Sequence, residues 1–396
     1  MKVAMLGWEF PPFVSGGLGV HCFHLTRSLC KLGVKIDFFM PASGKHILPS
    51  HPSLRIFEVS KVSQGPYLSF SQQAKNLSRT YGENILPSIE KYNLQCHEFA
   101  KNLHAKEKYD LIHAHDWLTA SAARSLKQEL SIPTVHTMHS TEFDRNAVPW
   151  RFIADIERGA IGNADRVITV SNRMKRQLVE KFNAEEKKIR VIFNGVESEE
   201  FENKDTLSRI SLPLLQNKKK VLFLGRLTGQ KAPAEFLRAA KEVLCLEPNT
   251  AFLIAGTGDM LPHLLNLSIT LGIQKSVIFL GYLSDEDRKK IYCQCDVYVM
   301  PSVSEPFGIT ALEAMASGTP TIISTNSGVG EAVKTVLRVD FWDTRAMAEK
   351  IIALLRYPPL SSTMSGMSYS EARQFTWAAA ARETLKVYDE LLALKK

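Results

Sequence analysis

Two glutamates flank a glycine in residues 302–320, which read SVSEPFGITALEAMASGTP. Glu305 precedes a proline, and Glu313 follows eight residues later on a helix expected to begin beside Gly308. Carboxylates accept hydrogen bonds from hydroxyls, and the unpaired N–H groups at a helix start attract anions. The spacing fits a ligand that carries both hydroxyls and an anionic group, although two acids on a solvated rim would show the same pattern.

Glycines and cations follow two other apolar runs. Gly16 and Gly17 open a helix after the first run, where backbone N–H groups can approach a ligand. Arg226 and Lys231 flank a turn after the run at residues 219–224. Each residue alone is equally well explained as a turn or as solvated surface. Their shared position after apolar runs predicts a site that holds a diphosphate.

The elements that must position these residues alternate along the chain. Near-continuous runs of Val, Ile and Phe, separated by helix-length segments such as residues 17–31, predict parallel strands buried on both faces. Ligands of such sheets lie outside the carboxyl ends of the strands, where the residues above fall. The sequence therefore predicts an α/β protein with two Rossmann-like, doubly wound parallel sheets.

The alternation also predicts the domain limits. It pauses in a charged, proline-containing segment, residues 197–218, which we interpret as a linker. Residues 1–196 form the expected first domain and residues 219–373 the second. A final helix follows the second sheet without another strand, and we expect residues 374–396 to return to the first domain.

The composition is that of a globular protein with a mild basic bias, since 396 residues carry a formal net charge of +8. No stretch approaches the roughly eighteen continuous apolar residues of a membrane span, and the N-terminus resembles a short strand rather than a secretory signal. With six scattered cysteines, we expect a cytoplasmic protein with reduced thiols, no transmembrane segment and no nucleic-acid partner. The charge suits nucleotides, polyanionic substrates or peripheral contact with an anionic membrane, and the oligomeric state stays open.

Two competing motifs are set aside. GGLGVHC resembles part of a dinucleotide fingerprint, but Cys22 occupies the third glycine position and Asp37 falls inside a strand rather than at its end. Residues 285–287 read DED, a metal-binding pattern of some transferases. They follow Ser284, so we interpret them as acids in the first turn of a capped helix.

Four histidines on neighbouring strands raise the question of zinc: His113, His115, His136 and His139. Strand alternation turns His136 and His139 differently, and no cysteine or carboxylate joins the four histidines, so no metal site is predicted. His139, at the end of its strand, is a candidate for contacting substrate.

The chain resembles retaining family-four glycosyltransferases and the related glycogen and starch synthases. The resemblance runs nearly the whole length and in the family's order: PPFVSGGLG, DLIHAHDWLTA, TMHS, VITVSN, VIFNGVESEEF, FLGRLTGQK, IAGTGD and SEPFGITALEAMASGTPTI. It implies the GT-B architecture, in which two Rossmann-like domains face each other across a cleft.

The resemblance also implies roles for single residues. Glu305 would hold hydroxyls of the donor sugar, Glu313 the ribose, and His139 the sugar, while Asp116 would contact the acceptor. His139, Glu305, Arg226 and Lys231 would form the catalytic set. The implied donor site comprises Gly16, Gly17, Asn194, Arg226, Lys231, Glu305, Phe307, Gly308, Ile309, Thr310 and Glu313.

The implied reaction proceeds at one face of the sugar with retained anomeric configuration, and the leaving phosphate takes the acceptor proton. No metal or other cofactor is required, because Arg226 and Lys231 supply positive charge. The resemblance points to ADP-glucose or UDP-glucose as donor and an α-1,4-glucan as acceptor. Val14 stands where those synthases usually carry lysine, so a lipid, phosphosugar or small-molecule acceptor stays open. A nucleotide-sugar epimerase or a silent nucleotide-sugar-binding protein would share the architecture.

Overall fold

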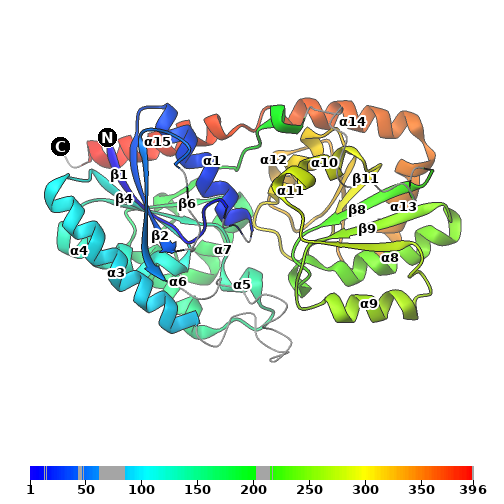
Figure 1. Cartoon of the computed structure of the whole chain (residues 1–396), viewed down its shortest axis with the longest axis horizontal. Helices are drawn as coiled ribbons and strands as arrows, with labels where there is room; N and C mark the ends of the chain where they lie inside the picture. Colours follow the sequence, from blue (N-terminus) through cyan, green and yellow to red (C-terminus); the bar gives the residue numbers. More distant parts are fainter. Residues whose placement is uncertain are drawn as a thin grey trace. The chain divides into compact units, whose positions relative to one another are not determined.

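The computed structural model describes residues 1–12, 14, 16–42, 47, 49–61, 85–201, 215 and 217–394. These residues form two compact units, which Figure 1 shows along the chain. The first unit contains the described residues from Met1 to Asn194 together with those from Trp377 onward, and the second contains those from Gly195 to Thr376. The predicted linker at residues 197–218 lies largely outside the described residues.

The first unit is built on a parallel sheet in the order β3-β2-β1-β4-β5-β6-β7. Its central strands are buried along their whole length because helices cover both faces. The strands are β1 (Lys2–Leu6), β2 (Lys35–Ala42), β3 (Leu54–Lys61), β4 (Leu111–His115), β5 (Thr134–Met138), β6 (Arg166–Thr169) and β7 (Ile189–Val191).

The helices of this unit pack in groups. In Figure 1, α3 and α4 run side by side, and the chain's last helix, α15, packs against α1. The prediction of a helix at residues 17–31 is confirmed by α1. The elements are α1 (Gly17–Lys31), α3 (Ile85–Lys106), η1 (Trp117–Thr119), α4 (Ala120–Leu130), α5 (Glu142–Arg145), α6 (Arg151–Asn163), α7 (Asn172–Phe182), η2 (Glu186–Lys188) and α15 (Trp377–Ala393).

The second unit has its own parallel sheet in the order β10-β9-β8-β11-β12-β13. Its strands are β8 (Lys219–Leu224), β9 (Thr250–Ala255), β10 (Val277–Gly281), β11 (Val297–Met300), β12 (Thr321–Ser324) and β13 (Leu337–Val339). Its helices are η3 (Ser198–Phe201), η5 (Gly229–Lys231), α8 (Pro233–Leu246), α9 (Leu261–Thr270), α10 (Asp285–Cys293), α11 (Ile309–Ala316), α12 (Val329–Ala332), α13 (Thr344–Arg356) and α14 (Pro358–Ala372).

The prediction of two Rossmann-like parallel sheets is confirmed, but two edge strands were not foreseen. β3 reads LRIFEVSK, and its charged residues interrupt the apolar run that marks a buried strand. β13 has three residues, which is too short for any periodicity to show. Both strands form at an edge because a neighbour already in the sheet offers its unpaired backbone groups.

Residues of the motifs that were set aside form hydrogen bonds within the fold. The side chain of Ser284 accepts a hydrogen bond from Asp287 N at 3.1 Å, so the DED acids form a capped first turn as predicted. Asp37 is buried in β2, where Arg55 donates two hydrogen bonds of 2.7 Å and Tyr109 a third. None of the six cysteines, all of which lie in the described residues, forms a disulfide. Among the described residues, no helix has the length and apolar character needed to cross a membrane.

Candidate active site

The centre of the candidate site in the second unit is an ion pair between Lys231 and Glu305. Lys231 ends η5, which follows β8, and Glu305 lies in the loop after β11. Because β8 and β11 are adjacent parallel strands, both loops emerge at the same edge of the sheet. The Lys231 Nζ lies 2.6 Å from Glu305 Oε2, and the Ser302 hydroxyl donates to the same oxygen at 3.1 Å.

Backbone contacts hold these two loops in place. The Gln230 side chain donates to the carbonyl of Ser304 at 3.0 Å, and Val303 N donates to the carbonyl of Gln230 at 2.9 Å. On the other side, Glu305 N donates to the Asn326 carbonyl at 3.1 Å. The carboxylate of Glu305 is therefore positioned by the loop as well as by Lys231.

The start of α11 lies directly after this loop. Gly308 precedes the helix with a φ of 111°, a left-handed conformation that favours glycine. A Cβ at this position would lie 2.7 Å from Cε of Met300. The Thr310 hydroxyl accepts a hydrogen bond from Tyr298 at 2.8 Å, and the buried Phe307 accepts one from Val329 N at 2.7 Å. The first N–H groups of α11, from Ile309 onward, are thus presented beside Glu305 by a supported turn.

The second predicted glutamate lies deeper than the sequence indicated. Glu313 is 3% exposed on α11, forms an ion pair with Arg288 of α10, and accepts a hydrogen bond from Tyr292 at 2.9 Å. Its carboxylate already has two partners within the protein. The predicted contact with a ribose stays a prediction.

Arg226 follows β8, and its Nη2 lies 3.5 Å from Oε1 of Gln230. The sequence analysis missed a neighbouring acid, Asp259, in the loop after β9. Burial raises the pKa of Asp259, although the positive charge of Arg226 opposes the shift. Its position after an apolar run, within IAGTGD, is the signal that could have revealed it.

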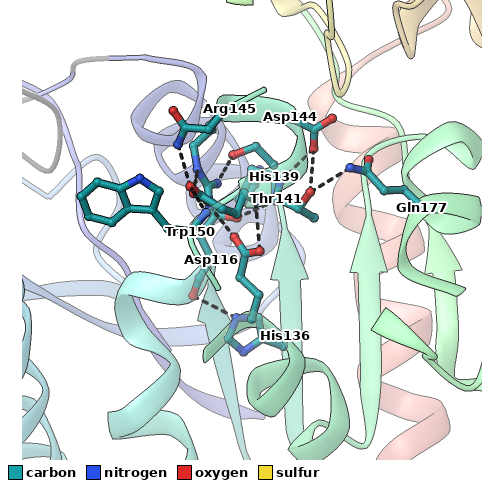
Figure 2. Close-up of polar contacts among 12 residues, drawn as sticks. Asp116, His136, His139, Thr141, Asp144, Arg145, Trp150 and Gln177 are labelled. Carbon is teal, nitrogen blue, oxygen red and sulfur yellow. Dashed lines mark hydrogen bonds and ion pairs between the residues drawn. The ribbon is translucent and has the colours of Figure 1, made fainter. Parts of the chain in front are cut away.

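The first unit brings His139 and Asp116 together at the ends of β5 and β4 (Figure 2). His139 N donates to Oδ1 of Asp116 at 2.7 Å, and Nε2 of His136 donates to the Asp116 carbonyl at 3.0 Å. Asp116 has a φ of 53°, and burial raises its pKa to about 6. This geometry indicates that Asp116 positions His139. It does not test the predicted contact between Asp116 and the acceptor.

A histidine that the sequence analysis missed links the remaining predicted residues of this unit. His21 lies one turn after Gly17 on α1, and its Nδ1 donates to Oδ1 of Asn194 at 2.8 Å. The ring centroids of His21 and His139 are 4.4 Å apart, and His115 Nδ1 lies 3.0 Å from His139 Nε2. Gly16 and Gly17 are exposed at the start of the same helix.

These rings are neutral near pH 7. Burial lowers the pKa of His139 to about 3, and it lowers the pKa values of His21 and His115 well below their ordinary range. A neutral imidazole has one N–H donor and one acceptor nitrogen. His139 can therefore exchange hydrogen bonds with a sugar hydroxyl but supplies no positive charge.

A buried ionic network lies immediately after His139 (Figure 2). Arg145 forms ion pairs with two fully buried acids, Glu142 and Glu157. The segment is also fixed by a capping box between Thr141 and Asp144. Burial outweighs the attraction of Arg145 and raises the pKa of Glu157 to about 7. The network holds the segment after β5 and thereby supports the backbone of His139.

Solved structures match the fold over nearly the whole chain. Sucrose-phosphate synthase from Thermosynechococcus elongatus superposes with a TM-score of 0.81 at 24% identity, over 99% of each chain. A structure from Anabaena in complex with UDP and glucose gives 0.76 at 18% identity, over 98% of this chain and 100% of that one. The fold with its two Rossmann-like units is the GT-B architecture of glycosyltransferases.

Sequence comparisons agree. A family model described as Glycosyltransferase Family 4 matches residues 15–200, and one described as Glycosyl transferases group 1 matches residues 204–370. An uncharacterized glycosyltransferase of Methanocaldococcus jannaschii is 34% identical over 84% of this chain and 83% of its own. The chain belongs to glycosyltransferase family 4.

Two characterised kinds of relative match at similar identity. A D-inositol 3-phosphate glycosyltransferase of Corynebacterium diphtheriae is 28% identical over 100% of this chain and 96% of its own. A glycogen synthase of Mycobacterium tuberculosis is 27% identical over 98% of this chain and 94% of its own.

Proposed function

We propose that the enzyme transfers a sugar from a nucleoside-diphosphate sugar with retention of configuration. The observation that carries this proposal is the Lys231–Glu305 pair, which lies at the sheet edge beside the start of α11. A cation, a carboxylate and the backbone N–H groups at a helix start match a diphosphate that bears a hydroxyl-rich sugar.

The proposed chemistry breaks the bond between the sugar and the diphosphate. Arg226, Lys231 and the first N–H groups of α11 stabilise the charge that develops on the leaving diphosphate, and Glu305 accepts hydrogen bonds from the sugar. Removing one such donor costs about 2.7–4 kcal/mol of transition-state stabilisation. The leaving phosphate takes the proton of the acceptor hydroxyl, so that attack and departure occur on the same face.

We propose glucose as the sugar, from ADP-glucose or UDP-glucose, and an α-1,4-glucan as the first acceptor to test. The glycogen synthase relative and the complex of the Anabaena structure with UDP and glucose support this choice. A phosphosugar acceptor is the second candidate. The D-inositol 3-phosphate glycosyltransferase relative, together with Val14 in place of lysine, favours it.

A donor-and-acceptor screen tests the proposal. ADP-, UDP- and GDP-sugars are each combined with a glucan, an inositol phosphate and a short-chain lipid acceptor, and release of the nucleoside diphosphate is measured. Acceptor-dependent release with one donor supports a transferase, and the anomeric configuration of the product reports retention. Interconversion of nucleotide sugars without an acceptor would instead identify an epimerase.

Metal removal is a separate prediction. We expect transferase activity to survive EDTA, because Arg226 and Lys231 supply the positive charge that a metal would otherwise supply to the diphosphate. Activity is measured after dialysis against chelator, with and without added magnesium or manganese. Complete loss that either ion restores would contradict the metal-independent assignment.

A further inference from the structure

Three histidines from separate elements converge in the first unit. His21 comes from α1, His115 from the end of β4, and His139 from the residue after β5. Each offers one ring nitrogen, and these nitrogens all lie within 4.8 Å of one another. The strand histidines that the sequence singled out do not include His21, which α1 adds to the cluster.

Each of the three residues is held by a contact outside the cluster. Nδ1 of His21 donates to Asn194, the backbone N of His115 donates to the Thr119 hydroxyl at 3.1 Å, and the backbone N of His139 donates to Asp116. A metal-binding histidine commonly donates its second ring nitrogen to an oxygen acceptor, which fixes the tautomer and the ring orientation. The contact between His21 and Asn194 has this form and leaves the lone pair on Nε2.

One free nitrogen of the cluster is buried without a protein partner. Nε2 of His21 is buried and has no hydrogen-bond partner. An unpaired buried polar atom destabilises the folded chain, and a ligand at this nitrogen would relieve that cost. His139 is only partly buried, so the cluster can be reached from its side.

The spacing suits a small ion. With metal–nitrogen bonds of about 2.0–2.1 Å, two ligands of a tetrahedral ion lie about 3.3 Å apart. His115 Nδ1 and His139 Nε2 are 3.0 Å apart. If an ion replaced the proton that they share, the two nitrogens would need to move apart by only a few tenths of an ångström.

We propose that His21, His115 and His139 form a binding site for a zinc-class divalent ion, with three imidazoles and one open coordination position. A nitrogen-only ligand set selects Zn²⁺, Co²⁺, Ni²⁺ or Cu²⁺ over Mg²⁺ and Ca²⁺, which prefer oxygen. The ion occupies a ring nitrogen of His139. If His139 contacts the sugar of the proposed reaction, as the resemblance to the family implies, the bound ion therefore inhibits transfer rather than supporting it.

Cobalt titration tests the site without any substrate. Tetrahedral Co²⁺ absorbs visible light strongly, so a titration of the full-length protein reports affinity, stoichiometry and geometry, and Zn²⁺ is measured by displacement. The parent protein carries Cys245→Ser, because Cys245 is an exposed free thiol that would bind cobalt adventitiously. Mg²⁺ at the same concentration is the negative ion.

The matched variants are His21→Gln, which removes one ligand, and His263→Gln, which removes an exposed histidine of α9 in the second unit. We expect one equivalent of tetrahedral Co²⁺ in the parent and in His263→Gln. We expect His21→Gln to weaken Co²⁺ binding by about 100-fold or more. Loss of a residue that only hydrogen-bonds a metal ligand typically weakens binding by about 10–100-fold, so a larger effect indicates a lost ligand. His139→Gln, at a partly buried position, is the second variant if His21→Gln lowers the melting temperature.

Three results would overturn the proposal: no tetrahedral cobalt spectrum in the parent, equal affinity in His21→Gln and the parent, or loss of binding in His263→Gln. The activity measurement is independent. Zinc that binds at the three histidines and inhibits transfer supports both the metal site and the proposed role of His139. Zinc that binds there without inhibition retains the metal site and removes His139 from the sugar contact.

Discussion

At the scale of single residues, the candidate site depends on the ion pair between Lys231 and Glu305. The side chains of Lys231 and Glu305 are 18% and 11% exposed, so each is largely shielded from water while paired with the other. A substrate that bound Lys231 through phosphate oxygens would compete with Glu305 for that cation. Glu305 can thus hold Lys231 in place before a donor binds. Donor binding then needs little reorganisation of the Lys231 side chain.

Removing either cation should therefore slow the reaction without unfolding the protein. We expect Arg226→Ala and Lys231→Ala each to lower kcat by about 10²-fold or more, because each donates to charge that develops in the transition state. Steady-state rates on the identified substrate measure the effect. Arg238→Ala is the control, since Arg238 pairs only with Glu235 on the exposed surface of α8 among the contacts described. Parent-like rates in both variants would remove the diphosphate assignment.

Gly308 carries a second residue-scale prediction. Gly308→Ala forces a left-handed conformation on alanine and brings its Cβ against Met300, so we expect a loss of about 1–3 kcal/mol in the free energy of unfolding and reduced activity. Gly366→Ala is the control, because its Cβ would meet nothing within 4 Å in α14. It should leave stability equal or raise it by about 0.5–1 kcal/mol. Urea denaturation compares the two, and equal stabilities would argue against strain at Gly308.

At the scale of elements, the short segment after β5 is held by buried polar contacts. The four-residue helix α5 is too short to be stable by itself. Its position is set by Arg145, which joins Glu142 within α5 to Glu157 on α6, and by Gln177 of α7, which donates to Thr141 at 2.9 Å. Helices α6 and α7 therefore both contact the segment that follows His139.

Arg145→Ala tests that arrangement. It leaves two fully buried acids without their cation, and we expect a loss of about 3–5 kcal/mol in the free energy of unfolding. Urea denaturation followed by tryptophan fluorescence provides the measurement. Arg158→Ala, which breaks an exposed pair with Asp155, should change stability by less than about 0.5 kcal/mol. Adding Glu157→Gln to Arg145→Ala should recover part of the loss. A small effect of Arg145→Ala would show that water enters the site.

At the scale of the whole molecule, the two units differ in how they respond to pH. The described residues of the first unit include six histidines whose pKa values burial lowers: His21, His104, His113, His115, His136 and His139. In the unfolded chain the same rings take up protons near pH 6.5. The folded state therefore binds fewer protons below that pH, and its stability falls as the solution is acidified.

We expect the first unit to lose stability between pH 7 and pH 5, before ordinary carboxylates titrate. Each ring contributes a loss of at most about 2 kcal/mol at pH 5. Asp116 and Glu157 act in the opposite direction, because their raised pKa values of about 6 and about 7 let the folded state bind protons first. Six rings against two acids leave a net loss of stability.

Thermal melting followed by tryptophan fluorescence measures this loss. The fully buried tryptophans Trp8, Trp117 and Trp377 all belong to the first unit, so the signal reports chiefly on that unit. A melting temperature that stays constant from pH 7 to pH 5 would contradict the prediction. A decline that begins only near pH 4 would assign acid sensitivity to carboxylates instead.

The sequence by itself determined most of the strands of both sheets and the candidate functional residues that follow them. Apolar runs buried on both faces predicted parallel sheets, and the end of each strand located Gly17, Asp116, His139, Arg226 and Glu305, because a parallel sheet places its loops at one edge. Edge strands β3 and β13 escaped this reasoning, since pairing with a neighbour, rather than their own pattern, makes them strands.

Only the tertiary structure decided which side chains meet. His21 contacts Asn194 across 173 residues of sequence, and Glu313 faces Arg288 from another helix. Periodicity indicates which face of an element is buried, but not which residue of a distant element lies opposite. The convergence of His21 with His115 and His139 depends on how α1 packs against the sheet, so it could emerge only once the helix was placed.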